Sequence, residues 1–196
     1  MDLASAFFEH AVIAHWPIWF VTITLVLAAV IDGFELKVPN WITFPMIISG
    51  WIYSACFAQS HFGLTWYEGL GWSLAGTAIG LLTLLPLYSI GGMGAGDVKL
   101  MAGIGAWVHV KITLWSFAVS GVIGAVLAIL MVLYRNAWGK HSGQFWMILN
   151  EIATIKDPEQ LSEIAAKRKS SMLLLPYGIP IAMGTIAYFA WTSMLV

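Results

Sequence analysis

The sequence is poor in charged residues and in cysteine. Only 10% of its 196 residues are charged, whereas soluble domains carry about 25%, so water is not the solvent for most of the surface. The single cysteine, Cys56, lies within an apolar run, which argues against a disulfide framework and a zinc knuckle. The formal net charge of -1 also argues against nucleic acid as a partner.

Apolar residues are abundant instead. Hydrophobic residues make up 60% of the chain, and the mean hydropathy is +0.83. The eleven Trp and ten Phe residues add to this, because aromatic rings favour the two interfaces of a membrane. No linker or low-complexity segment divides the chain. These features predict an all-α polytopic membrane protein with one transmembrane domain, residues 1–196, in contact with the lipid bilayer.

A helix that crosses a membrane needs about 20 apolar residues, because the hydrocarbon core is about 30 Å thick. Five stretches have about this length, and the segment 98–110 is a shorter, sixth candidate. The five longer stretches are 11–31, 41–58, 69–89, 112–134 and 172–195.

Small residues four positions apart predict sites of close helix packing. These pairs are Gly76 with Gly80, Ala102 with Ala106, and Gly121 with Ala125.

The positions of the basic residues decide between five and six helices. With six helices, eight of the nine Lys and Arg residues fall in loops on one side, and only Lys111 falls on the other. The positive-inside bias makes that side cytoplasmic. A five-helix arrangement would put Lys99 and the loop 135–170 on opposite sides. We therefore predict six transmembrane helices, the short one at about 98–110, with both termini extracytoplasmic and a cytoplasmic loop at 135–170.

Acidic residues at membrane depth are costly and therefore suggest a function. Asp32 ends the first span, and Asp97 follows the glycine-rich string GGMGAG. Each alone has a structural explanation: Asp32 as a solvated acid at the membrane boundary, and Asp97 as a helix N-cap. Glycines before Asp97 permit a positive φ and a close backbone approach. The predicted topology, however, places both acids on the same, cytoplasmic face.

Two such acids suit peptide hydrolysis. One carboxylate acts as general base and activates water, while a protonated carboxyl group polarises the carbonyl group. Two carboxyl groups in close contact share a proton and titrate as a pair, so the sequence leaves open which one holds it. The glycine loop beside Asp97 would let an extended substrate strand lie against the backbone. This predicts an aspartic peptidase that uses Asp32 and Asp97.

Three strings carry a resemblance to a known family. Asp97 completes a GxGD string with Gly94 and Gly96, and Asp32 begins a D-x6-P-N string that ends at Pro39 and Asn40. The late string LPYGIPIAMG covers 175–184. Together they resemble the type IV prepilin peptidases and their archaeal preflagellin relatives over nearly the whole chain.

The resemblance implies an endopeptidase of the bacterial cytoplasmic (inner) membrane. It would remove leader peptides from pilin-like precursor proteins at the cytoplasmic face, with Asp32 and Asp97 as the catalytic pair and no cofactor. Longer relatives carry paired CxxC motifs and also methylate the new N-terminus. This chain resembles the short, peptidase-only form of tight-adherence pilus systems, so methyltransferase activity is not expected.

Several residues around the two acids are candidates for supporting roles. Gly94, Gly96, Pro39 and Asn40 are candidates for loop support or substrate binding. Glu35 either attracts a basic leader peptide or is a solvated loop acid. Lys37 and Lys99 either orient a carboxylate or, as we prefer, are cationic anchors that reach the interface. The five histidines show no ligand spacing, so no metal site is predicted.

Two other hypotheses are weaker. Presenilin-type proteases share the GxGD acid, but their first acid follows Tyr and they carry a Pro-Ala-Leu string. Here Ile31 precedes Asp32, and that string is absent. A six-helix transporter with a proton or cation relay predicts acids near mid-membrane and an internal repeat, neither of which the sequence contains. The pilin substrate and the oligomeric state stay open.

Overall fold

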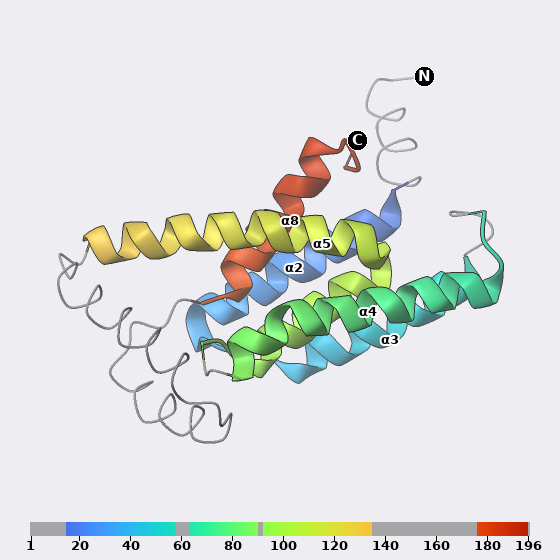
Figure 1. The fold of residues 1–196 in the computed structure, drawn as a ribbon, viewed down its shortest axis with the longest axis horizontal. Helices are drawn as coiled ribbons and strands as arrows, with labels where there is room; N and C mark the ends of the chain where they lie inside the picture. Colours follow the sequence, from blue (N-terminus) through green and yellow to red (C-terminus); the bar gives the residue numbers. More distant parts are fainter. Residues whose placement is uncertain (1–14, 58–62, 90–91, 135–175, 196) are drawn as a thin grey trace.

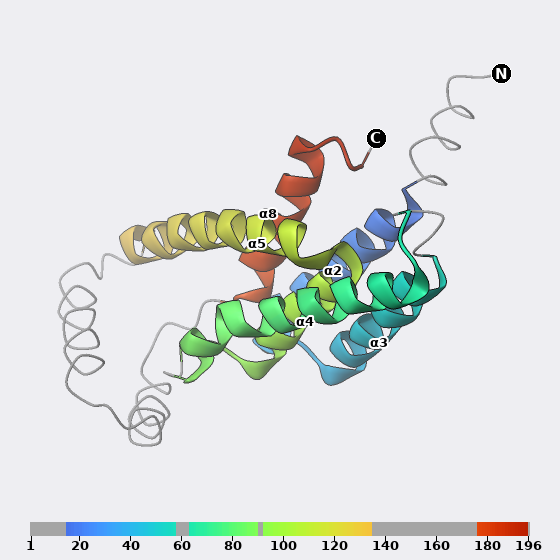
Figure 2. The same cartoon turned by 45° about the vertical axis from the view of Figure 1, so that its right-hand side comes forward.

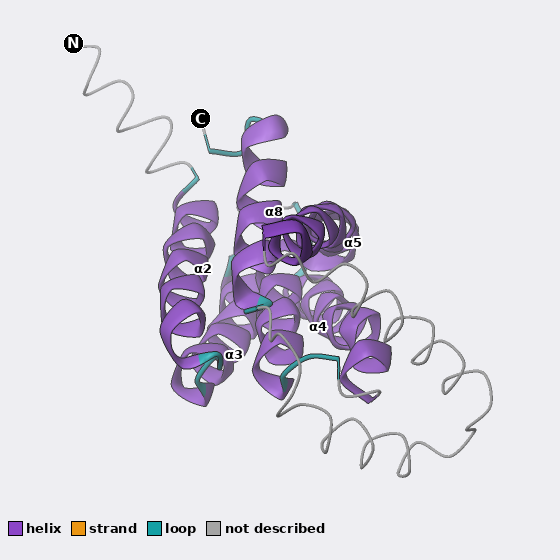
Figure 3. Cartoon of the chain, turned by 90° about the vertical axis from the view of Figure 1, so that its left-hand side faces the viewer, coloured by secondary structure: helices purple, strands orange, loops and turns teal. Residues whose placement is uncertain are grey.

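The computed structural model describes residues 15–57, 63–89, 92–134 and 176–195, and the regular elements in these ranges are all α-helices (Figures 1 and 3). They are α2 (Trp16–Glu35), α3 (Asn40–Cys56), α4 (Trp66–Ser89), α5 (Ala95–Tyr134) and α8 (Gly178–Trp191). The predicted all-α class is confirmed. The predicted loop 135–170 lies outside the described residues.

Some of the described helices have the length and polarity expected of membrane spans. Three described helices are long and apolar enough to cross a membrane: α2, α4, and α5 over Ala95–Met131. Helix α8 is a shorter apolar helix of 14 residues. Large hydrophobic side chains such as Ile23 and Val122 are about two-thirds exposed on the outer surface. Such an outer surface suits lipid as a solvent rather than water.

Helix α5 is broken into two halves. Its 40 residues would extend about 60 Å as a straight helix, about twice the thickness of a hydrocarbon core. At His109 the backbone leaves the helical conformation, with φ 61° and ψ −175°. The chain then reverses direction, and the second half passes across α8 (Figures 1 and 2). The break lies near the end of the predicted segment 98–110, just before the predicted segment 112–134 begins.

Hydroxyl groups from neighbouring helices bind the backbone at this break. The carbonyl oxygen of Ala106 accepts hydrogen bonds from Ser54 Oγ of α3 at 3.3 Å and from Ser73 Oγ of α4 at 2.5 Å. After the break, Thr113 Oγ1 donates to the His109 carbonyl oxygen at 2.5 Å. Helix ends leave carbonyl groups in need of partners. The two buried serines therefore stabilise the end of the first half of α5.

The first half of α5 forms the centre of the bundle. Leu100, Met101 and Ile104 on it are fully buried, and the half packs against both α3 and α4. Its Trp107 donates from Nε1 to the Met46 carbonyl oxygen of α3 at 2.9 Å. The Trp107 ring also stacks on Tyr53, with ring centroids 4.8 Å apart. This central position fixes the start of α5 relative to the helices around it.

Glycines allow α4 to approach α5 closely. A Cβ atom at Gly76 would collide with the Gly105 carbonyl oxygen, and one at Gly80 with the Met101 carbonyl oxygen. The predicted packing role of the Gly76–Gly80 pair is confirmed. The prediction for Gly121 is wrong, because a Cβ atom there would meet no atom within 4 Å. That glycine lines a cavity instead.

We predict that Gly76→Ala destabilises the protein because the added methyl group must displace the backbone of α5. Overpacking of this kind costs about 1–3 kcal/mol. The measurement is thermal unfolding of the purified protein in detergent, followed by tryptophan fluorescence. Gly121→Ala is the matched control and is expected to unfold at or above the wild-type temperature. Equal unfolding temperatures for the two variants would contradict the packing argument.

Candidate active site

Asp32 lies in the last turn of α2 and is almost fully buried, with 2% of its surface exposed. Its Oδ2 atom accepts a hydrogen bond from the backbone N–H of Gly178, the first residue of α8, at 2.7 Å. Helix α2 ends at Glu35. The C-cap residue Leu36 follows with a left-handed φ of 53°, and its N–H donates to the Asp32 carbonyl oxygen at 2.8 Å. The Asp32 carboxyl group therefore faces the N-terminus of another helix.

Asp97 lies in the first turn of α5, with 5% of its surface exposed. Its Oδ2 atom accepts a hydrogen bond from the N–H of Gly94, the residue before the helix, at 3.1 Å. The side chain thus reaches back over the helix start from inside the first turn, rather than from the N-cap position. A negative charge is favourable at this point, because helix N-termini carry a partial positive charge.

The glycine loop brings the two acidic regions together. A Cβ atom at Gly96 would lie 2.5 Å from the carbonyl oxygen of Val38, in the connection between α2 and α3. Gly96 is not needed for a positive φ, because Gly63 is the only glycine with a positive φ among the described residues. The glycine at 96 therefore serves close approach: the segment after Asp32 packs directly against the segment before Asp97.

The start of α8 lies beside both acids. Tyr177 immediately precedes Gly178, the donor to Asp32. The pKa of the Tyr177 hydroxyl is raised, first by burial and second by the negative charge of Asp97. The sequence assigns neither residue a role, and the only signal for them is their place in the string LPYGIPIAMG. The fold shows that the Tyr177-Gly178 dipeptide connects the surroundings of Asp32 with those of Asp97.

Asn40 and Lys99 form a contact of their own. Lys99 Nζ donates to Asn40 Oδ1 at 3.0 Å and lies 4.7 Å from the centre of the Phe44 ring. Pro39, half-buried, precedes the first residue of α3 with an extended backbone. The lysine therefore joins the start of α5 to the start of α3.

Glu35 and Lys37 differ from the two aspartates. Both residues are exposed, at the end of α2 and just after it. The fold does not bring them into the buried part of the site.

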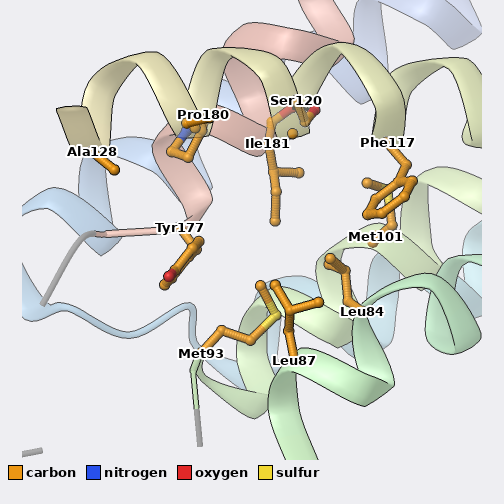
Figure 4. A pocket seen from close by; sticks show the side chains of 13 residues that line it. Leu84, Leu87, Met93, Met101, Phe117, Ser120, Ala128, Tyr177, Pro180 and Ile181 are labelled. Carbon is orange, nitrogen blue, oxygen red and sulfur yellow. Dashed lines mark hydrogen bonds between the residues drawn. The ribbon is translucent and has the colours of Figure 1, made fainter. Parts of the chain in front are cut away.

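An apolar cavity of about 290 Å³ lies next to Tyr177, between α4, α5 and α8 (Figure 4). The Tyr177 side chain points into it, with Met93 of the glycine loop on the facing wall. Its larger wall residues are Leu84, Leu87, Met93, Met101, Phe117 and Tyr177. Such a lining accepts an apolar side chain rather than a charged one.

The chemistry available at this end of the bundle is that of two carboxyl groups. No group of three or more His, Cys, Asp or Glu residues able to hold a metal ion occurs in the described ranges. Both carboxyl groups are buried, and both accept hydrogen bonds from backbone N–H groups. Two carboxyl groups near each other, held by such donors, can carry out general acid–base catalysis.

The fold and the site thus define a helical bundle of membrane type with two buried carboxyl groups at one end. Residues 19–129 match the type IV leader peptidase family, a region that includes both Asp32 and Asp97. The match extends over more than half of the chain. The protein belongs to this family.

Curated relatives agree with this assignment. The prepilin leader peptidase/N-methyltransferase of Pseudomonas aeruginosa is 31% identical over 120 residues, which are 58% of this chain and 39% of the relative. Proteins of the same name from Aeromonas salmonicida and Aeromonas hydrophila are 30% identical over 122 residues, again 39% of their length. The chain therefore covers well under half the length of these relatives. No solved structure matches the chain significantly.

We predict that Asp97→Asn lowers the pKa of Tyr177, because the substitution removes the negative charge that helps to raise it and leaves only the effect of burial. The measurement is an NMR titration of protein labelled with [¹³Cζ]tyrosine, in which Tyr177→Phe identifies the resonance. Glu35→Gln removes an exposed acid of the same end of the bundle and is expected to leave the titration unchanged. An unchanged titration in Asp97→Asn would show that the two side chains are not neighbours.

Proposed function

We propose that this protein is a membrane aspartic endopeptidase that cleaves the leader peptide from type IV pilin-like precursors. Asp32 and Asp97 are the catalytic pair. One observation carries the proposal: the region that matches the leader peptidase family contains two buried aspartates, both next to the first residues of α8. The names of the relatives from Pseudomonas and Aeromonas state the same peptidase activity for those proteins.

In the proposed mechanism the pair holds one proton. The ionised carboxylate takes a proton from water, which attacks the scissile carbonyl carbon. The protonated carboxyl group donates a hydrogen bond to the carbonyl oxygen and later supplies the proton that the leaving amine needs. Burial away from bulk water strengthens both interactions. The N–H groups of Gly94 and Gly178 supply fixed dipoles that hold the carboxyl groups in place.

Substrate approach would come from the exposed side of this end. Glu35, exposed at the end of α2, is suited to attract a basic leader peptide. Gly94 and Gly96 leave the backbone before Asp97 without side chains, so an extended strand of substrate can lie against it. Asn40 accepts a hydrogen bond from Lys99 at the start of α3. Together with Pro39 it would hold the connection between α2 and α3 in position.

We further propose six membrane crossings, with the halves of α5 on either side of His109 as two of them, and both termini outside the cytoplasm. The bundle end with Asp32 and Asp97 then faces the cytoplasm of a bacterial inner membrane. The transporter hypothesis finds less support, because a relay requires acids along the middle of the spans. Asp32 instead lies within one turn of the end of α2, and Asp97 in the first turn of α5.

Asp32→Asn and Asp97→Asn are each expected to abolish cleavage, because an amide can neither accept a proton from water nor donate one to the leaving group. Loss of an acid–base group costs about 100-fold or more in rate. The measurement is co-expression with a candidate prepilin and determination of the mature N-terminus by mass spectrometry. Glu68→Gln, an exposed acid in the first turn of α4, is the control and keeps wild-type cleavage. Full cleavage by either Asn variant at wild-type abundance would rule out the pair.

Cysteine labelling tests the topology. Cys56 is exposed at the C-terminal end of α3, whereas Asn40 begins that helix. It is expected to react in intact cells with a maleimide that cannot cross the inner membrane. In a Cys56→Ala background, Ser162→Cys in the predicted loop 135–170 is expected to react only after the cells are opened. Labelling of Ser162→Cys in intact cells would contradict the cytoplasmic assignment.

A further inference from the structure

Helix α8 begins in direct contact with the Asp32 side chain. The N–H of Gly178, its buried first residue, donates to Asp32 Oδ2 at 2.7 Å. A Cβ atom at position 178 would lie 2.9 Å from Oδ2, 3.0 Å from Cβ and 3.1 Å from Cγ of Asp32. Distances this short are rare for real side chains, so the contact requires a residue that has an N–H and no side chain. Glycine alone meets both conditions.

The N–H of Gly178 is available to Asp32 at little cost to the helix. The first four N–H groups of an α-helix have no intrahelical partner, so a bond from Gly178 to a carboxylate removes none of the internal hydrogen bonds of α8. The partial positive charge at the helix N-terminus adds to the attraction. The beginning of α8 and Asp32 therefore stabilise each other.

The rest of α8 is fixed elsewhere, so its start cannot easily move back. Ser120 Oγ of the second half of α5 donates to the Ile181 carbonyl oxygen at 3.2 Å. A Cβ atom at Gly184 would collide with the backbone at Ser120, which shows how closely the two helices pack. A side chain at position 178 would therefore displace the Asp32 carboxyl group rather than the helix.

We propose that Gly178 is a positioning residue of the catalytic pair, which holds the Asp32 carboxyl group in place and stabilises its ionised form. This inference rests on the proposed peptidase function. An N–H group can only donate, so it stabilises a carboxylate and not a protonated oxygen. The Gly178 N–H donates to Asp32 Oδ2 at 2.7 Å, a length typical of a strong hydrogen bond to a carboxylate.

Two alanine variants at the same contact between α2 and α8 test the role. In Gly178→Ala we expect kcat for prepilin cleavage to fall about 100-fold, as for a catalytic group displaced by about 1 Å, with KM unchanged. The acidic limb of the pH–rate profile is expected to move to higher pH, since the displaced carboxylate loses its donor. Gly33→Ala is the matched control, because a Cβ atom there would lie 3.6 Å from Ile179 Cδ1, an ordinary contact. It is expected to stay within about twofold of wild type.

A second measurement needs no catalytic activity. In protein labelled with [¹⁵N]glycine, the Gly178 amide resonance is identified by its loss in Gly178→Ala, or by sequential assignment if that variant does not fold. We expect it at low field and expect it to move in Asp32→Asn, but not in Glu68→Gln. The same resonance in wild type and Asp32→Asn would overturn the inference.

The two measurements separate the inference from the proposed function. Wild-type cleavage by Gly178→Ala would overturn the positioning role and leave the peptidase function intact. Wild-type protein that cleaves no prepilin would refute the peptidase function. The Gly178 amide would then still decide whether the contact with Asp32 exists.

Discussion

A carboxyl group inside an apolar helical bundle must be given hydrogen-bond partners by the protein, because neither lipid nor hydrocarbon side chains supply any. This requirement governs the arrangement at one end of the molecule. The donors to Asp32 and Asp97 are backbone N–H groups at or just before the N-termini of α8 and α5. Helix starts are the one place where a helical protein has such groups to spare. The starts of these two helices therefore supply hydrogen-bond donors to the two acids.

The same requirement explains why glycines gather around the site. A backbone donor reaches a carboxyl group only if the chain comes close enough, and a side chain on the donor residue would prevent this. Gly178 meets the condition at Asp32, and Gly96 meets it between the loop before Asp97 and Val38. In the middle of the bundle Gly76 brings α4 and α5 together in the same way. Close backbone approach, rather than unusual dihedral angles, is the common physical reason for these glycines.

Several of these features could be predicted from the sequence because they depend on local patterns. The lengths of the apolar stretches indicated the helices, and the end of the short segment 98–110 lies at the break that the fold has at His109. The two acids stood out because charge is rare in this chain. The role of Gly178 could not be predicted, since it arises from a contact with Asp32, 146 positions earlier in the chain. The open space at Gly121 was likewise invisible, because residue spacing does not show which face of a helix has a neighbour.

The surroundings of the two acids are unequal, and this has consequences for catalysis. Asp32 receives its donor from a different helix, so its position depends on the packing of α8 against α2 and α5. Asp97 receives a donor from three residues earlier in the chain, so the loop that contains Gly94 helps to fix its position. Tyr177 immediately precedes Gly178, the donor to Asp32. The negative charge of Asp97 contributes to the raised pKa of the Tyr177 hydroxyl. A shift in the start of α8 would therefore move the donor to Asp32 and, at the same time, the Tyr177 side chain next to Asp97. A pair that must divide one proton between two carboxyl groups is sensitive to such a coupling, because small differences in stabilisation decide which group is ionised.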